Sequence, residues 1–183
     1  MIPAKKKLNG FSLIEVLLAI VLVTAGMLSA IQLVSVGLVT ASDSRNELTA
    51  NLLAQEGIEL VRNIRDNNFS ANPQRDGFAG FPATNSNNCR IDIMGELDCS
   101  GGSNTLNIDV AGFFSYVTVG TIQTSFSRQI SIIYDVTPST SAKTATVTSM
   151  VTWGNSQFQT AANCTVAKKC IYDQMTFTKW GSL

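Results

Sequence analysis

Side chains capable of catalysis are scarce in this 183-residue chain. It contains no histidine, which excludes Ser-His-Asp and Cys-His nucleophilic catalysis and removes the commonest metal ligand. Glu56 and Glu59 could in principle form a pair of catalytic acids, but their spacing is far more typical of the solvated face of a helix. The sequence also lacks a P-loop, a glycine-rich dinucleotide loop and a metal-binding helix motif. We therefore expect a protein that is not an enzyme and that has no catalytic residue, cofactor or metal.

Four cysteines are the remaining reactive groups. Cys89 and Cys99 are ten positions apart, and Cys164 and Cys170 are six apart. Zinc sites favour two cysteines separated by two to four residues, and the CxxC motif of redox proteins is absent. Structural disulfides are the default in an exported domain. The spacing favours the local pairs, Cys89 with Cys99 and Cys164 with Cys170, although the crossed pairings are still open.

The net charge gives no sign of a polyanionic partner. Thirteen basic and thirteen acidic side chains balance each other, so the chain as a whole does not attract nucleic acid. A few lysines towards the C-terminus share no motif with aromatic residues, which is weak evidence for a nucleic-acid groove. These lysines are Lys143, Lys168, Lys169 and Lys179. We do not expect nucleic acid to bind.

Charges are missing from one long stretch near the N-terminus. Residues 1–10 form a leader with Lys5, Lys6 and Lys7 and no acid, and residues 11–41 follow with a single charge, Glu15. As a helix this stretch is about 46 Å long, enough to cross a hydrocarbon core of about 30 Å. The lysines before it predict a cytoplasmic leader and a C-terminal region outside the membrane.

Glu15 is the residue that a simple membrane segment does not explain. A carboxylate in an apolar helix costs about 2.5–3.5 kcal/mol at the bilayer centre and less near its edge. A secretory signal cleaved near Ala25, or a plain single-span anchor, would fit the apolar run but leave this charge without a partner. Cleavage between Gly10 and Phe11 would create an α-amino group one helical turn from Glu15.

The residues around Gly10 resemble the N-terminal methylation motif of type IV prepilins and pseudopilins. The shared pattern is a short basic leader, glycine before the cut, an apolar residue after it, glutamate at mature position five and a long apolar run. This resemblance implies cleavage after Gly10 by prepilin peptidase, N-methylation of Phe11 and a role for Glu15 in filament assembly. It also implies a place in the cytoplasmic (inner) membrane. Residues 10–20 and 50–65 are most similar to minor pilins of the PilV kind.

The helical period continues beyond the apolar stretch. From Ser42 onward, apolar residues recur at three- and four-residue steps with polar residues between them. No proline occurs between Pro3 and Pro73. The pattern predicts one helix over residues 11–67, with 11–41 in a membrane or a filament core and 42–67 amphipathic. The positions expected on its apolar face are Leu48, Leu52, Leu53, Gly57, Leu60, Val61 and Ile64.

The remainder, residues 68–183, is predicted to form a globular β-sheet head. Residues 67–107 are rich in Asn, Ser, Gly and Asp, which is typical of a long irregular connection. Strands are expected over 113–122, 126–136, 144–153 and 171–180, the middle two joined by a turn at Pro138. The strand 126–136 is expected to present one apolar face made of Phe126, Ile130, Ile132 and Tyr134.

These elements predict an α+β fold in which a long transmembrane and amphipathic helix packs on a C-terminal antiparallel sheet. With the resemblance, they point to a structural minor pilin or pseudopilin of an extracellular or periplasmic filament, either a type IV pilus or a type II secretion-like filament. The expected partners are prepilin peptidase, other pilin subunits, the assembly platform and the membrane, crossed once. The alternative is a membrane-anchored adhesin or DNA-uptake receptor that uses the same processing route.

Overall fold

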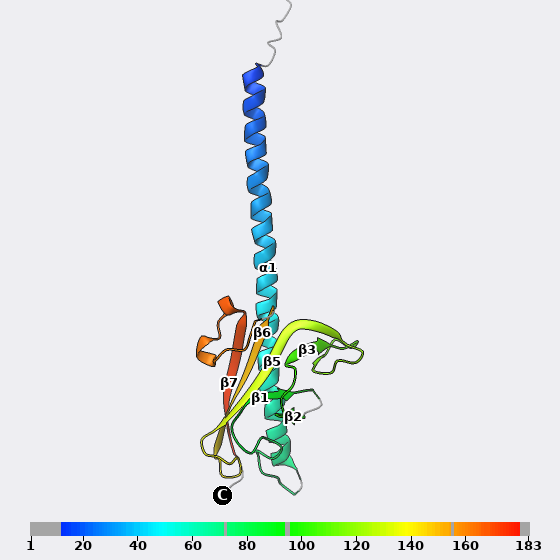
Figure 1. Ribbon diagram of the computed structural model, residues 1–183, viewed down its shortest axis with the longest axis vertical. Helices are drawn as coiled ribbons and strands as arrows, with labels where there is room; N and C mark the ends of the chain where they lie inside the picture. The colour runs from blue at the N-terminus through cyan, green and yellow to red at the C-terminus, as the bar shows by residue number, and fades with distance from the viewer. Residues whose placement is uncertain (1–11, 72, 94–95, 155, 180–183) are drawn as a thin grey trace, which may run out of the picture. The chain divides into compact units, whose positions relative to one another are not determined.

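The computed structural model describes residues 12–71, 73–93, 96–154 and 156–179. It divides into two compact units, Met1–Ser44 and Arg45–Leu183. The first unit contains the beginning of helix α1, which runs from Leu13 to Ser70, and the second contains the rest of that helix together with the sheet (Figure 1). The leader, residues 1–10, and the expected cleavage site at Gly10 and Phe11 lie outside the described residues.

Helix α1 is continuous, as the absence of proline predicts. Its first turn is closed by the Ser12 carbonyl, which accepts hydrogen bonds from the backbone N–H groups of Glu15 and Val16 at 3.0 and 3.3 Å. The helix ends at Ser70 rather than at residue 67. Near this end the Asn68 side chain donates to the carbonyl of Ala79 at 2.7 Å, which ties the last turn to the returning chain.

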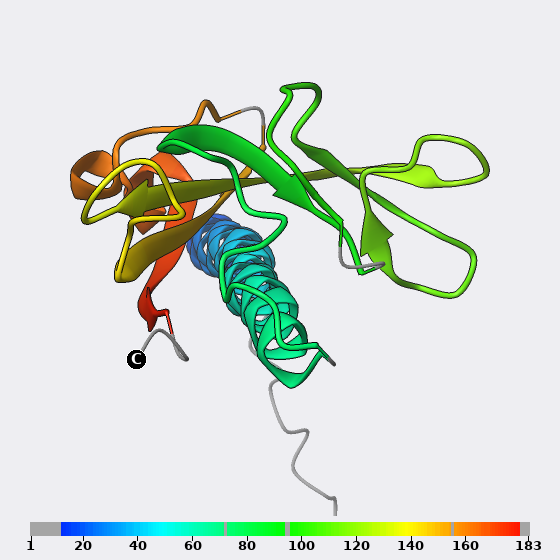
Figure 2. The same cartoon turned by 90° about the horizontal axis from the view of Figure 1, so that it is seen from below.

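The sheet is antiparallel and is built around one long strand, β5 (Ile122–Tyr134). Along one edge β5 pairs with β6 (Thr144–Trp153), which pairs with β7 (Cys170–Thr178). Two shorter strands share the other edge, β1 (Ser86–Ile91) beside the later half of β5 and β3 (Thr105–Ile108) beside its earlier half. The two-residue strands β2 (Leu97–Asp98) and β4 (Phe114–Ser115) extend β1 and β3 (Figure 2).

Two parts of the predicted strand pattern are wrong. The segment 67–107 was expected to be irregular, but it contributes β1, β2 and β3, because pairing with β5 orders sequences that have little strand character of their own. The strand expected over 113–122 is reduced to β4. The chain turns back after it, where the Thr121 hydroxyl donates to the Val117 carbonyl at 2.8 Å.

The second half of α1 covers one face of the sheet with small and branched side chains. Ala50, Ala54 and Gly57 lie against the strands and let the helix approach closely. Their neighbours Leu53, Ile58 and Val61 are buried as well. The expectation that Leu48 and Leu52 lie on this face is wrong: they are 62% and 58% exposed. The helix packs on the sheet with the stripe that contains Ala50 and Ala54, and the neighbouring stripe with Leu48 and Leu52 is exposed.

Candidate functional site

The described part of the unit Met1–Ser44 is a helical segment whose residues are all exposed. The helix is long and apolar enough to cross a membrane, and none of its most apolar 18-residue window is buried. Its large apolar side chains between Leu13 and Val39 are 47–78% exposed. Water is a poor surrounding for such a surface, so this segment is suited to lipid or to the helices of neighbouring chains.

Four hydroxyl side chains of this segment are satisfied within the helix itself. The Thr24 hydroxyl donates to the Val21 carbonyl at 3.0 Å, and the Ser29 hydroxyl donates to the Ala25 carbonyl at the same distance. Ser35 and Thr40 make the same kind of bond at 2.9 Å. Hydroxyl groups that are satisfied locally can enter an apolar environment at little cost.

Glu15 differs from these residues because its carboxylate has no such partner in the described part of the chain. It lies in the first turn of α1, where the helix dipole favours a negative charge. Among the residues that the structure describes, none forms an ion pair with it. The carboxylate is therefore available to a cation outside this part of the chain. Phe11, whose amine would be that cation after cleavage, is not among the described residues.

The head contains a buried charge that the sequence prediction missed. Arg128 lies on the face of β5 that meets α1, and its side chain is completely buried. The guanidinium donates to the carboxylate of Glu56 at 3.0 Å, to the Leu53 carbonyl at 3.2 Å and to the Ile91 carbonyl at 2.9 Å. One side chain thus connects β5 with the helix and with β1.

Tyr116 completes this cluster from the segment after β4. Its hydroxyl donates to the Arg128 carbonyl at 3.0 Å and accepts from the Arg128 Nε at 3.3 Å. Burial raises the pKa of Tyr116, so the hydroxyl stays protonated. Burial alone would lower the pKa of Arg128, but Tyr116 and the Glu56 carboxylate outweigh it and raise that pKa. Arg128 is therefore a permanent charge held by fixed partners.

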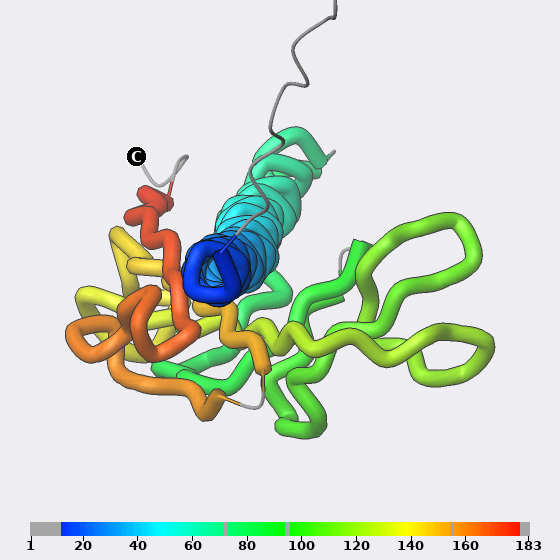
Figure 3. Tube along the Cα trace, turned by 90° about the horizontal axis from the view of Figure 1, so that it is seen from above, coloured from blue at the N-terminus to red at the C-terminus, as the bar shows by residue number. Residues whose placement is uncertain are grey.

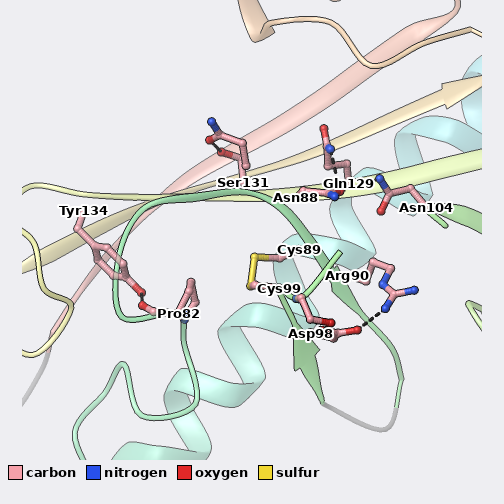
Figure 4. Close-up of a disulfide and its surroundings, with 12 residues drawn as sticks. Pro82, Asn88, Cys89, Arg90, Asp98, Cys99, Asn104, Gln129, Ser131 and Tyr134 are labelled. Carbon is pink, nitrogen blue, oxygen red and sulfur yellow. Dashed lines mark hydrogen bonds and ion pairs between the residues drawn. A yellow bond between two sulfur atoms is a disulfide. The ribbon is translucent and has the colours of Figure 1, made fainter. Parts of the chain in front are cut away.

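The cysteines are paired locally in the structure. Cys89 is bonded to Cys99, joining β1 to the residue that follows β2, and Cys164 is bonded to Cys170 at the start of β7. Figure 4 shows the first bond beside an ion pair between Arg90 and Asp98. Hydrogen bonds from the Ser100 side chain and backbone, helped by Arg90, lower the pKa of Asp98 to about 2.

The remaining polar candidates act as structural partners. Glu56 and Glu59 do not form an acid pair: Glu56 binds Arg128, and Glu59 binds Arg62 at 2.6 Å. Lys179 likewise binds Asp76 at 2.6 Å. Within the described ranges, no group of three or more acidic, cysteine or histidine side chains could hold a metal ion.

Comparison with known proteins gives one finding, and it concerns the N-terminus. Residues 5–31 match the family model described as the prokaryotic N-terminal methylation motif. No curated protein and no solved structure matches the chain significantly. The motif supports the assignment of this chain to the type IV pilins and pseudopilins, and it does not distinguish one class of these proteins from another. The long apolar helix with an antiparallel sheet is the α+β fold expected for such a protein.

Proposed function

We propose that this chain, whose N-terminus carries the methylation motif of type IV prepilins, is a minor pilin or pseudopilin. It would serve as a structural subunit of a type IV pilus or of a type II secretion-like filament. In this proposal prepilin peptidase removes residues 1–10 by cutting after Gly10, and the new N-terminal residue, Phe11, is N-methylated. The observation that carries the proposal is Glu15, the single charged residue of the apolar stretch, which lies in the first turn of α1 where the helix is exposed.

Storage in the cytoplasmic membrane and transfer to a filament follow from the same helix. Lipid and the helices of neighbouring subunits are about equally apolar, so exchanging one for the other changes the apolar free energy little. The head stays on the outer side of the hydrocarbon core throughout, and the assembly platform moves the subunit. The minor class is favoured by the likeness of residues 10–20 and 50–65 to PilV-like minor pilins.

Glu15 would then set the position of the subunit in the filament. At the edge of a bilayer its carboxylate can keep part of its hydration, but a packed filament excludes both water and lipid. The positive amine of Phe11 on an adjacent subunit can compensate the charge only at one axial offset. The ion pair would therefore fix the register between neighbouring subunits.

Substitutions of Glu15 test this function. Glu15→Val keeps Gly10 and the apolar run, so the protein should be inserted and cleaved normally but enter filaments poorly. Glu15→Asp should be partly defective, because the shorter side chain reaches less far. The measurement is the amount of processed protein in membrane fractions and in sheared filaments. Equal incorporation of Glu15→Val and the wild type would contradict the pairing.

A further inference from the structure

Exposed apolar side chains gather in one part of the head, residues 109–122, which we name the apolar lobe. It consists of the turn after β3, strand β4 and the loop into β5, and it extends away from the rest of the sheet in Figures 2 and 3. No charged side chain occurs over residues 110–127. The apolar residues of the lobe that are 53–100% exposed are Val110, Phe113, Val117, Val119 and Ile122. A gathering of this kind marks a contact surface.

Three backbone groups of the lobe are already satisfied by its own side chains. The carboxylate of Asp109 accepts hydrogen bonds from the N–H groups of Ala111 and Phe113 at 2.8 and 2.9 Å. The Thr121 hydroxyl donates to the Val117 carbonyl at 2.8 Å. Because these groups already have partners, the lobe can leave water without exposing them to an apolar medium unsatisfied.

The base of the lobe is held firmly. Tyr116 bonds to the buried Arg128, and the Phe114 ring meets the Phe126 ring edge-on with centroids 6.4 Å apart. The exposed side chains are therefore presented by an ordered support, which lowers the entropic cost of a contact.

The lobe belongs to the end of the head where the chain leaves the apolar stretch. Leu106, Phe114 and Tyr116 pack in one cluster with Ala50 and Leu53, among the first turns of α1 in the unit Arg45–Leu183. The apolar stretch ends at residue 41, only nine positions before Ala50. At about 46 Å that stretch is about as long as a bilayer with its headgroup regions is thick, roughly 40–45 Å. The residues that follow the stretch therefore lie near the bilayer surface.

We propose that, while the subunit is held in the membrane, the apolar lobe inserts into the headgroup boundary of that same bilayer. The inference rests on the proposed function in one respect: the apolar stretch must anchor the chain in the membrane. The lobe has no Lys or Arg, so the contact depends on apolar burial and not on anionic lipid. The anchor keeps the lobe at a high local concentration near the surface, so a weak intrinsic affinity is sufficient. The contact restricts the orientation of the head before assembly.

Site-directed spin labels on the whole chain test the contact. The protein would be placed in nanodiscs of phosphatidylcholine, one copy per disc, with a label at Val117→Cys, Val136→Cys or Leu28→Cys. Val117 and Val136 are 53% and 54% exposed, and Val136 follows the far end of β5, so these two positions form a matched pair. Leu28 reports on insertion of the apolar stretch. Accessibility to oxygen and to a water-soluble nickel chelate is the readout.

We expect the labels at Val117 and Leu28 to lose access to the nickel chelate on entering discs, and the label at Val136 to keep it. Loss at Leu28 without loss at Val117 would overturn the lobe contact and leave the anchor standing. Absence of loss at Leu28 would overturn the anchor, and with it both proposals. Loss at Val117 only in discs with several copies would assign the lobe to a neighbouring chain and also overturn the lipid contact.

A charge placed in the lobe gives a second test. Val119→Asp should restore nickel access to the label at Val117, because a carboxylate opposes burial among lipid headgroups and chains. Val136→Asp is the matched control and should change nothing. Unchanged protection of Val117 in the Val119→Asp variant would contradict insertion.

Discussion

Arg128 occupies a position on β5 where the alternation of buried residues calls for an apolar side chain. Phe126 and Ile130 flank it on the same face and are buried, as Arg128 is. The sequence prediction named only the apolar residues of this face and left Arg128 out. It could not show that a charge is tolerated there, because Glu56 lies 72 residues earlier and two of the other acceptors are backbone carbonyls. A buried charge satisfied by distant groups leaves no local signal.

Removal of this guanidinium should destabilise the head strongly. Arg128→Met removes one donor from the Ile91 carbonyl and the partner of the Glu56 carboxylate, and losing such buried hydrogen bonds costs about 1–3 kcal/mol for each group left unsatisfied. The free energy of unfolding in urea, measured on the detergent-solubilised chain, checks this. Arg62→Met, which breaks the exposed pair with Glu59, should cost less than about 1 kcal/mol. Equal losses in the two variants would contradict the role of Arg128.

Asp98 makes the stability of the head depend on acid pH. Its pKa is about 2 in the folded chain against an ordinary value of 3.8. The stabilisation is present above pH 3.8 and is lost as the pH falls towards 2. Because Asp98 is 43% exposed, we expect a contribution of about 1 kcal/mol or less. Asp98→Asn should unfold with a shallower pH dependence in this window, and an unchanged profile would contradict the assignment.

At the scale of elements, prediction succeeded where the local pattern was strong. The strand expected over residues 144–153 is β6 with the same bounds, and the helix is continuous as the run without proline predicts. Strands β1, β2 and β3 were missed because Asn- and Ser-rich segments become strands here only through pairing with partners. The helix face was partly misassigned because Leu48 and Leu52 are more hydrophobic than the alanines that pack on the sheet.

Close packing of α1 on the sheet depends on Gly57. A Cβ atom at this position would collide with the Ser149 hydroxyl and lie 3.1 Å from the Ile130 methyl group. Gly57→Ala would normally stabilise a helix by about 1 kcal/mol. Here we expect a net destabilisation of about 1–3 kcal/mol from overpacking, measured by urea unfolding.

Two further variants isolate the cause. Adding Ser149→Ala to Gly57→Ala should recover part of the loss, because it removes the colliding hydroxyl, which has no hydrogen-bond partner among the described residues. Gly26→Ala, where a Cβ meets nothing within 4 Å, should leave the stability of the head unchanged. A Gly57→Ala protein more stable than the wild type would refute the packing account.

The two disulfides close short loops, and each has one cysteine buried in the core, Cys89 in the first and Cys170 in the second. Digestion without reductant should release linked peptides that join Cys89 to Cys99 and Cys164 to Cys170. Each bond closes a short loop and should contribute about 2–3 kcal/mol, so reduction should lower the free energy of unfolding. Free thiols throughout, or a peptide that links Cys89 to Cys164, would disprove the local pairing.

At the scale of the whole molecule, the two units require different surroundings. The unit Met1–Ser44 exposes large apolar side chains, whereas the head has its own buried core and two disulfides. A membrane-stored filament subunit needs both properties in one chain. The methylation motif over residues 5–31 was recognisable from the sequence because its parts are adjacent. The partners of the head depend on surface shape, which a single sequence does not specify.

The intact mass of the exported protein tests the central claim most directly. The account predicts a chain that begins at Phe11 and carries one added methyl group. It also predicts that Gly10→Val remains in the membrane at full length, because a β-branched residue obstructs the cut. A wild-type chain that begins near Gly26, or one that still begins at Met1, would contradict processing as a prepilin.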